Sequence, residues 1–254
     1  MKASMIFSLA KNDFKAKYAG SAFGSFWAFL SPLVTVLIYW FVFQVAMKSN
    51  KIGDAPYILW LISGIAPWFF FSEALMAATT SMRDYSFLVK KTKFSYEYLP
   101  CIRIISALFV HVFFVALVYI ISVIFGYSPK FSNIQFAYYM ACLCALTYVL
   151  GQILAILNVY FKDVASVVNV LIQLGFWITP IFWDINNLSG RVKTMFAANP
   201  LFYIVRGYRD TFIYGKNTID YPLDGICFWC IIILLFCIGN KLLKSAKSEI
   251  PDLV

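Results

Sequence analysis

Charged residues are missing from long stretches of this 254-residue sequence. Residues 18–47 contain none, and neither do residues 131–161, 164–183 and 225–240. Only 13% of the chain is charged, 62% is hydrophobic and the mean hydropathy is +0.78. A water-soluble domain of this size could not hide so much apolar surface in its core. The composition therefore excludes an ordinary soluble protein and indicates a chain that lies almost wholly in a membrane.

Motifs for nucleotide binding and hydrolysis are missing as well. The sequence contains no G-x-x-x-x-G-K-[ST] loop, no H-E-x-x-H pair, no G-x-S-x-G turn and no paired carboxylates. The single histidine, His111, lies among apolar residues, so we expect it to bond to a neighbouring helix. We predict no catalytic site and no cofactor in this chain. No nucleic-acid motif accompanies the net charge of +9, which suits an anionic membrane surface.

Metal-ligand spacings are missing too. The six cysteines are Cys101, Cys142, Cys144, Cys227, Cys230 and Cys237. Cys227 and Cys230 form a C-x-x-C pair, yet no redox-fold pattern surrounds them. Cysteine inside an apolar helix behaves as a small hydrophobic residue. We therefore predict packing roles for the cysteines and no metal site.

Six apolar stretches are long enough to cross a bilayer. A transmembrane helix needs about 20 apolar residues, and a backbone surrounded by lipid must satisfy its own hydrogen bonds by forming a helix. The predicted spans are residues 26–47, 57–80, 101–126, 135–159, 165–183 and 225–243. The expected fold is all-α and integral to the membrane, with one domain over residues 1–254.

The charges of the connecting segments predict the orientation. Six spans place both termini on one side of the membrane. That side carries 13 Lys and Arg residues, and the opposite side carries 8. Because positively charged loops tend to stay in the cytoplasm, we predict cytoplasmic termini.

The N-terminal segment, residues 1–20, precedes the first span. Within it, Ile6, Leu9, Ala10 and Phe14 recur at helical spacing, and lysines occupy another face. This pattern predicts a helix that lies on the membrane surface. The alternative is a solvated basic tail that only fixes the topology.

The stretch 82–98 is the longest strongly charged part of the chain, and on this map it is cytoplasmic. Its apolar residues could bury against a partner while its lysines surround the contact. The residues predicted to make this contact are Phe87, Leu88, Lys90, Lys91 and Phe94. The alternative is an ordinary positively charged loop.

The segment 184–224 lies on the opposite side, yet residues 194–205 are uncharged and largely apolar. Twelve residues are too few to cross the bilayer, and Asn199-Pro200 interrupts them. We predict a re-entrant hairpin that dips in from outside, which is tolerated where protein or water covers its backbone. The alternative is an amphipathic cap on the outer surface.

Two features within the spans are candidates for a transport pathway. Glu73 is a carboxylate in mid-span, where it is costly unless it is functional or bonded to another helix. Aromatic rings also lie inside the spans, and flat sugar faces stack on such rings. The pathway candidates are Tyr39, Trp40, Phe43, Trp68, Glu73, Phe176 and Trp177. For each ring, ordinary packing is the alternative.

Four stretches together resemble a known family. They are residues 14–33, 64–72, 158–164 with 179–181, and 199–201 with 206–210. In their order and spacing the chain resembles the membrane subunit of ABC type-2 polysaccharide exporters, especially those of O-antigen, with the teichoic acid and capsule exporters nearby. Lys162 stands where this family often has Arg, which keeps the charge but not the bidentate geometry.

The resemblance implies a homodimer in the bacterial inner membrane, joined by two copies of a separate ABC ATPase that binds ATP and Mg²⁺. The ATPase would dock on residues 82–98 and on the surface helix. Tyr160, Lys162 and Asp163 would form a second, smaller contact. ATP binding would open a channel for lipid-linked polysaccharide at the dimer interface, and the re-entrant segment would gate its outer mouth.

Two other interpretations stay open at this point. The chain is alternatively a type-2 exporter of another substrate, such as teichoic acid, capsule, a lipid or a drug. A membrane-embedded enzyme of glycan or lipid assembly is a further alternative. That interpretation requires a polar catalytic cluster, which His111 and Glu73 alone do not make.

Overall fold

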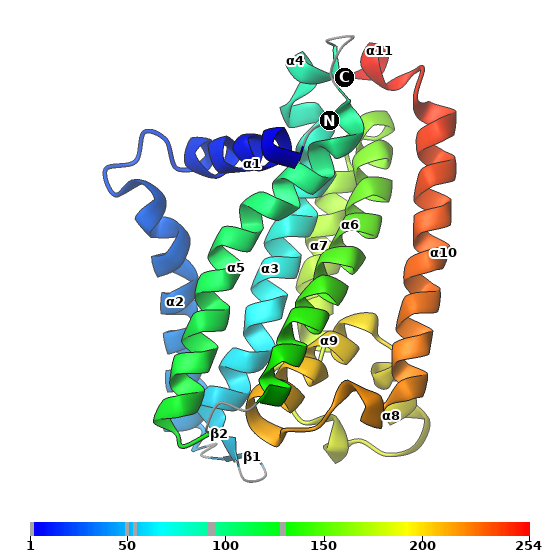
Figure 1. Cartoon of the computed structure of the whole chain (residues 1–254). Helices are drawn as coiled ribbons and strands as arrows, with labels where there is room; N and C mark the ends of the chain where they lie inside the picture. Colours follow the sequence, from blue (N-terminus) through cyan, green and yellow to red (C-terminus); the bar gives the residue numbers. More distant parts are fainter. Residues whose placement is uncertain (1–2, 49–50, 53–54, 91–94, 128–130) are drawn as a thin grey trace.

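A computed structural model describes residues 3–48, 51–52, 55–90, 95–127 and 131–254. The chain folds into a bundle of helices with both termini at one end (Figure 1). Two of the residues predicted to contact a partner, Lys91 and Phe94, lie outside the described residues.

The helices follow the apolar stretches closely. They are α1 (Ala3–Lys17), α2 (Trp27–Trp40), α3 (Tyr57–Asp84), α4 (Ser86–Val89), α5 (Leu99–Ile124), α6 (Phe136–Tyr160), α7 (Val164–Ile178), α8 (Gly190–Ala197), α9 (Pro200–Arg209), α10 (Pro222–Ala246) and α11 (Ile250–Leu253). A minimal antiparallel pair, β1 (Lys51–Ile52) and β2 (Ala55–Pro56), turns the chain between α2 and α3, with Lys51 opposite Pro56.

Five helical stretches of the described chain are long and apolar enough to cross a membrane. They are Gly24–Ala46, Tyr57–Asp84, Tyr96–Ile124, Asn133–Tyr160 and Pro222–Ala246. They confirm the multi-pass, all-helical class. The sixth predicted span, 165–183, is shorter: α7 has 15 residues, about 22 Å of helix. It ends at Ile178 because Thr179 precedes Pro180 and takes an extended conformation.

Helix α3 is the centre of the bundle. It packs against α5, α6, α7 and α9, while α2 and α10 lie at the periphery. Gly151 of α6 makes one of these contacts possible, because a Cβ there would lie 2.7 Å from the Cβ of Ala78. Pro67 lies inside α3 and cannot donate the hydrogen bond that its position would otherwise make to the preceding turn.

Helix α1 lies across the end of the bundle, roughly perpendicular to the long helices, and contacts α5 (Figure 1). Gly20 follows it with φ of +87°, a backbone conformation that favours glycine, and the chain then turns into α2. The predicted helix over the N-terminal segment is confirmed for residues 3–17. Its position on a membrane surface stays a prediction.

The segment 184–224 contains two short α-helices, α8 and α9, which meet at Asn199-Pro200, as the break in the sequence indicated, and a π-helical stretch, Asp210–Tyr214, continues α9. The Asn199 side chain accepts a hydrogen bond from the Leu201 amide at 3.0 Å and donates one to Thr179 Oγ1 at 3.1 Å. Helix α9 is buried against α3 and α6, whereas α8 has no buried residue. The pair lies at the end of the bundle opposite the termini. Its re-entrant position in a bilayer stays a prediction.

Candidate functional site

A second hydrophobic cluster lies at the termini end, apart from the main core. Its buried members come from α1, the ends of α3, α6 and α10, the start of α5, and α11. Ala10, Met82, Ile102, Ile156 and Ile250 are among them. Helix α1 and the C-terminal segment are therefore packed parts of the bundle and not loose tails.

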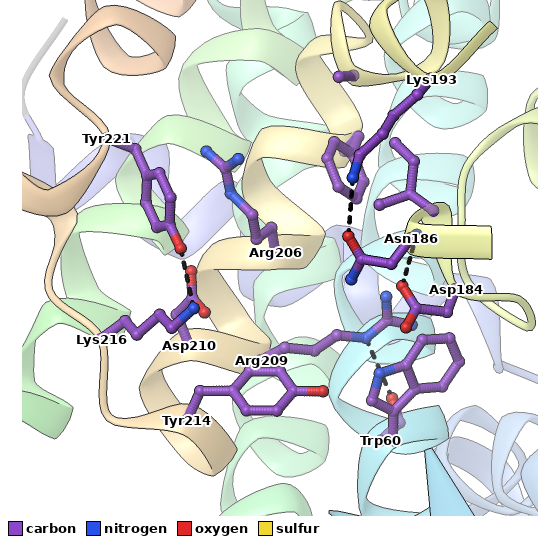
Figure 2. Close-up of a pocket in the computed structure, with 13 residues that line it drawn as sticks. Trp60, Asp184, Asn186, Lys193, Arg206, Arg209, Asp210, Tyr214, Lys216 and Tyr221 are labelled. Atoms are coloured by element: carbon purple, nitrogen blue, oxygen red, sulfur yellow. Dashed lines mark hydrogen bonds between the residues drawn. The ribbon is translucent and has the colours of Figure 1, made fainter. Parts of the chain in front are cut away.

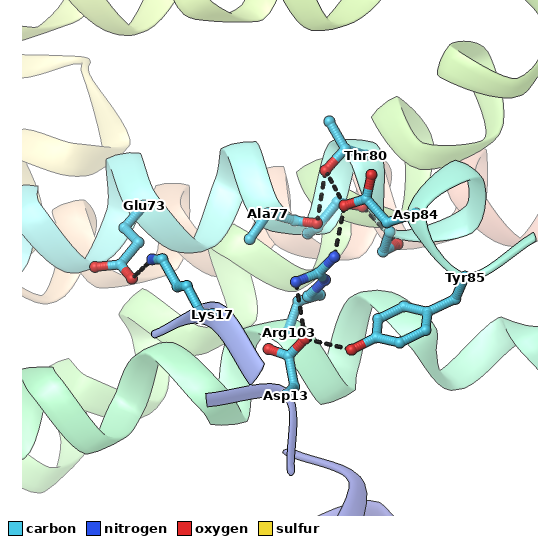
Figure 3. A network of polar contacts seen from close by, with 10 residues as sticks. Asp13, Lys17, Glu73, Ala77, Thr80, Asp84, Tyr85 and Arg103 are labelled. Atoms are coloured by element: carbon cyan, nitrogen blue, oxygen red, sulfur yellow. Dashed lines mark hydrogen bonds and ion pairs between the residues drawn. The ribbon is translucent and has the colours of Figure 1, made fainter. Parts of the chain in front are cut away.

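Asp13 joins α1 to the bundle through buried polar contacts (Figure 3). Its Oδ1 accepts hydrogen bonds from the Tyr85 hydroxyl at 2.5 Å and from Arg103 Nη1 at 2.8 Å. Arg103 also bonds Asp84 through Nη2 at 2.5 Å. Burial and the bond to Asp13 raise the pKa of Tyr85 to about 12, so its hydroxyl stays protonated as a donor. One carboxylate thus connects α1, α5 and the turn after α3.

Glu73 is an ion-pair partner of α1. Lys17, at the end of α1, pairs with the Glu73 carboxylate of α3 (Figure 3). Burial alone would lower the pKa of Lys17, but attraction to Glu73 raises it above its usual value. The structure therefore places this pathway candidate at the junction between α1 and α3.

The three described residues among the predicted partner contacts lie at the same end. Phe87 and Leu88 are on α4, with Phe87 largely exposed, and Lys90 follows them on the surface. A hollow of about 250 Å³ between α1, α4 and the start of α5 is lined by Leu9, Phe87, Leu88 and Ile102, among others. An apolar and partly open surface of this kind suits a protein contact.

Tyr160, at the end of α6, and Lys162 and Asp163, in the turn between α6 and α7, are exposed. Arg83, at the end of α3, holds this turn in place. Its Nε donates to the Asn158 carbonyl at 2.6 Å, and its Nη2 donates to the Val159 carbonyl at 2.9 Å. The end of α3 therefore connects the α4 surface directly to the second predicted contact.

The C-terminal segment braces both contacts, a role that sequence reasoning missed. The Tyr160 hydroxyl donates to Glu249 Oε2 at 2.7 Å, and the Tyr96 hydroxyl donates to the Lys247 carbonyl at 2.7 Å. Lys247 also pairs with Glu97 at 2.5 Å. Lys247 and Glu249 were not among the predicted contact residues, because their partners Tyr96 and Tyr160 lie 151 and 89 positions away in the chain.

Five of the seven pathway candidates form one aromatic cluster, between α2, α3 and α7. The ring centroids of Trp68 and Phe176 are 5.6 Å apart, and those of Tyr39 and Phe176 are 6.0 Å apart. Phe182 is at the middle, with centroids 4.9 Å from Tyr39, 5.2 Å from Phe43 and 5.9 Å from Trp177. Sequence reasoning missed Phe182, which it placed at the end of a span.

The members of this cluster differ in exposure. Trp68 and Phe182 are buried, whereas Trp177 is 63% exposed on α7. Gly175 allows the close approach of α7 to α3, because a Cβ there would lie 3.1 Å from the Trp68 ring. Trp40 is not among these ring contacts, and its indole donates at 2.6 Å to Oε1 of Gln44, which lies in the π-helical stretch Phe41–Ala46 that continues α2.

At the opposite end, Arg209 of α9 is buried without a carboxylate partner among the described residues. It donates to the carbonyls of Pro180 at 2.8 Å, Ile181 at 2.9 Å and Trp60 at 3.4 Å. Its guanidinium carbon lies 3.4 Å from the centre of the Trp60 ring, close enough for a cation–π contact. Burial lowers the pKa of Arg209 to about 9, so it stays charged at neutral pH.

His111 also bonds this segment, since its Nε2 lies 2.7 Å from the Tyr208 hydroxyl. The expected structural role of His111 is therefore confirmed. Among the residues that the structure describes, no group of three His, Cys, Asp or Glu side chains is arranged to hold a metal ion.

The sequence has clear relatives. The family described as ABC-2 type transporter matches residues 5–213. An O-antigen export system permease protein RfbA from Myxococcus xanthus is 25% identical over 250 residues, which cover 98% of this chain and 94% of that protein. A protein of the same name from Klebsiella pneumoniae is 24% identical over 247 residues, 97% of this chain and 93% of that protein. A second Klebsiella pneumoniae protein of that name is 25% identical over 244 residues, 95% and 93% of the two chains.

Proposed function

This chain belongs to the ABC-2 type transporter family, and from that membership we propose that it is the permease subunit of an ATP-driven polysaccharide exporter of the O-antigen type. The observation that carries the proposal is the similarity to O-antigen export permeases over nearly the whole of both chains. The substrate is a lipid-linked polysaccharide. Export runs from the cytoplasm to the far side of the bacterial inner membrane.

Coupling to a separate ABC ATPase uses the termini end of the bundle, which faces the cytoplasm. The ATPase docks over α4 and the hollow beside α1, with the turn at residues 160–163 as a second contact. Arg83 and the C-terminal segment join these two surfaces. When the ATPase moves α1, Asp13 transmits the displacement to α5 through Arg103, and Lys17 transmits it to α3 through Glu73. ATP and Mg²⁺ bind to the ATPase and not to this chain.

The pathway lies at the interface of a homodimer, and the exposed face of α7 supports this arrangement. Its residues recur at helical spacing and are about half exposed or more: Val167, Val170, Leu171, Leu174, Trp177 and Ile178. A second copy on this face would bring two aromatic clusters together. Stacked rings let a sugar chain slide without a deep binding well.

The neighbouring interpretations differ in substrate or in class. Exporters of teichoic acid, capsule, lipids or drugs would use the same coupling surface, and the relatives favour O-antigen among them. The assembly-enzyme interpretation is less favoured, because His111 is bonded to Tyr208 and Glu73 is paired with Lys17. These two groups serve packing in separate parts of the bundle.

Docking on α4 predicts the outcome of a double substitution. Phe87→Asp with Leu88→Asp puts two charges into an apolar contact. We expect the amount of ATPase that co-purifies with the chain from its native membrane to fall at least about tenfold. Affinity purification followed by mass spectrometry of the bound partners measures it.

The control is Ile219→Asp, which places the same charge on an exposed apolar residue at the opposite end of the bundle. It should leave the ATPase bound. Full retention of the ATPase by the double variant would contradict docking on α4. If the unchanged chain brought down no ABC ATPase, the exporter proposal itself would fail.

The exposed member of the aromatic cluster predicts a second outcome. Trp177→Ala should slow export about threefold to tenfold, because a stacking surface is lost, while the thermal stability of the chain stays nearly unchanged. Leu234→Ala on α10 is the control, since Leu234 is 61% exposed on another helix. Surface polysaccharide, followed over time on gels, is the measurement. Equal export by both variants would assign Trp177 to lipid contact.

A further inference from the structure

A pocket of about 490 Å³ opens at the end of the bundle opposite the termini (Figure 2). Its walls come from the start of α3, the segment after α7, helices α8 and α9, and residues 210–221. The volume is typical of small-molecule sites. The pocket is separate from both predicted ATPase contacts and from the aromatic cluster.

Asp210 is the feature that calls for a ligand. Its side chain lines the pocket, the residue is only 3% exposed, and its Oδ2 atom is buried with no hydrogen-bond partner among the described residues. Burial raises the pKa of Asp210 to about 6, so the carboxyl is mostly ionised at neutral pH. A buried carboxylate oxygen without a donor is costly. A donor supplied by a ligand would remove that cost.

Cationic donors line the same pocket. Lys216 Nζ donates to the Tyr221 hydroxyl at 3.2 Å (Figure 2), and its positive charge favours the ionised form of Asp210. Arg206 pairs with Asp224 and lies 4.1 Å above the centre of the Tyr221 ring. Lysine keeps further N–H groups free for a ligand when one is used.

On the opposite wall of the pocket, hydrogen-bond donors again lie beside acceptors. Lys193 Nζ donates to Asn186 Oδ1 at 3.0 Å, and Asp184 Oδ1 accepts from the backbone N–H of Asn186 at 2.9 Å. Phe202 and Ile185 add apolar wall between the two polar groups. Each side of the pocket thus offers at least one cationic donor and one carboxylate acceptor.

This arrangement selects against simple ions. The lining carries two carboxylates, Asp184 and Asp210, and four cations, which are Lys193, Lys216, Arg206 and Arg209. Arg206 is paired with Asp224, and Arg209 is bonded to backbone carbonyls, so the charges left for a ligand are two lysines and two carboxylates. Hydroxyl groups both donate and accept, so a ring that carries several of them can satisfy both kinds of partner at once. Apolar patches of the wall suit the C–H faces of such a ring.

We propose that this pocket binds a neutral pyranose unit, whose hydroxyls donate to Asp210 on one side and accept from Lys216 and Lys193. The inference rests on the proposed function, because the sugar would be one unit of the exported polysaccharide as it leaves the permease. Binding itself is independent of export and is measured separately.

The test uses the full-length chain, purified with its bound partners in lipid nanodiscs. The probes are neutral methyl pyranosides of glucose, galactose, mannose and rhamnose, followed by saturation-transfer NMR. We expect at least one to bind, and Asp210→Asn to weaken it about tenfold, because a charge-assisted hydrogen bond is lost. The anionic methyl glucuronide should bind more weakly than the neutral probes.

Two further variants keep the test decisive. Asp252→Asn makes the same change on exposed α11 and should have no effect. Ala197→Trp adds a bulky side chain at an exposed wall position of the pocket and should abolish binding without relying on Asp210. No saturation of any neutral probe, tighter binding of the glucuronide, or unchanged binding by Ala197→Trp would overturn the inference.

The outcome is distinct from that of the export proposal. If an ABC ATPase co-purifies and no neutral pyranoside binds, the exporter proposal stands and the pocket inference fails. If pyranosides bind in a manner that depends on Asp210 and no ATPase is found, the pocket inference stands and the export mechanism fails.

Discussion

Replacing Asp13 by alanine is expected to reduce polysaccharide export at least about tenfold while the chain stays in the membrane. The Asp13 side chain is 4% exposed and its partner Arg103 is 16% exposed. Removing one member of a buried ion pair costs about 3–5 kcal/mol, because the other charge is left without its partner. We expect the lower figure here, since Arg103 keeps Asp84. The hydroxyl of Tyr85 loses its acceptor at the same time.

The substitution should impair the coupling of ATP hydrolysis to export more than it impairs the folding of the chain. Asp13 holds α1 against the start of α5 and the turn that leads into α4, so its removal frees α1 from the ATPase contact surface. Basal ATP hydrolysis should continue, and a protease should cleave at Lys11 and Lys15 more readily. Export on gels, ATP hydrolysis and limited proteolysis of the purified complex measure the three effects.

Asp84→Ala is the matched control, because Asp84 bonds the same arginine from a side chain that is 44% exposed. An exposed ion pair contributes about 1 kcal/mol or less. Equal losses of export in the two variants would contradict the argument from burial. Normal export with a freely cleaved α1 would contradict the coupling role of this helix.

The second large effect concerns stability. Arg209→Leu should destabilise the chain by about 3–5 kcal/mol, because the buried carbonyls of Pro180 and Ile181 lose their donor, the Trp60 carbonyl loses one of its two side-chain donors, and the Trp60 ring loses its cation. Those carbonyls belong to the start of α3 and to the break after α7. Without Arg209, three segments lose their common anchor.

Arg206→Leu is the control on the same helix. Arg206 pairs with the half-exposed Asp224, so its loss should cost about 1 kcal/mol or less. Arg209→Lys should lie between the two, since a lysine keeps the charge but loses the planar set of donors. Thermal unfolding of the purified variants in the same detergent compares them. Similar midpoints for the two leucine variants would contradict the role of Arg209 as an anchor.

Features with a local signature could be predicted from the sequence. Uncharged stretches predicted the helices that cross the membrane, because length and hydropathy alone decide that property. The break at Asn199-Pro200 predicted where α9 begins, because proline suits the first turn of a helix and asparagine caps it. The repeat of Ile6, Leu9 and Phe14 predicted α1.

Pairings between distant residues could not be predicted in this way. Asp13 and Arg103 are 90 positions apart, and Lys17 and Glu73 are 56 apart. One signal was present, since Asp13 is the sole acidic residue before Asp54. A single carboxylate in a basic helix indicates an ion pair with a cation elsewhere in the chain. That this cation is Arg103 depends on how α1 crosses α5.

Helix α7 shows a different limit. Hydropathy runs through residues 165–183 without interruption, but the helix ends at Ile178, and the chain then turns so that Phe182 enters the aromatic cluster. Thr179-Pro180 was visible in the sequence as a break. The sequence contained no indication that the carbonyls beyond it would be held by Arg209.

Pro67 divides α3 into two arms of unequal length. About ten residues, or roughly 15 Å, precede it, and about 17 residues, or roughly 26 Å, follow it. Bending at a proline concentrates where the helical hydrogen bond is missing. A hinge at Pro67 would therefore let the Arg83 end of α3 swing while the Trp60 end stays in place. The short arm, which contacts Arg209 and carries Trp60 of the pocket wall, would then be insulated from movements at the ATPase contact.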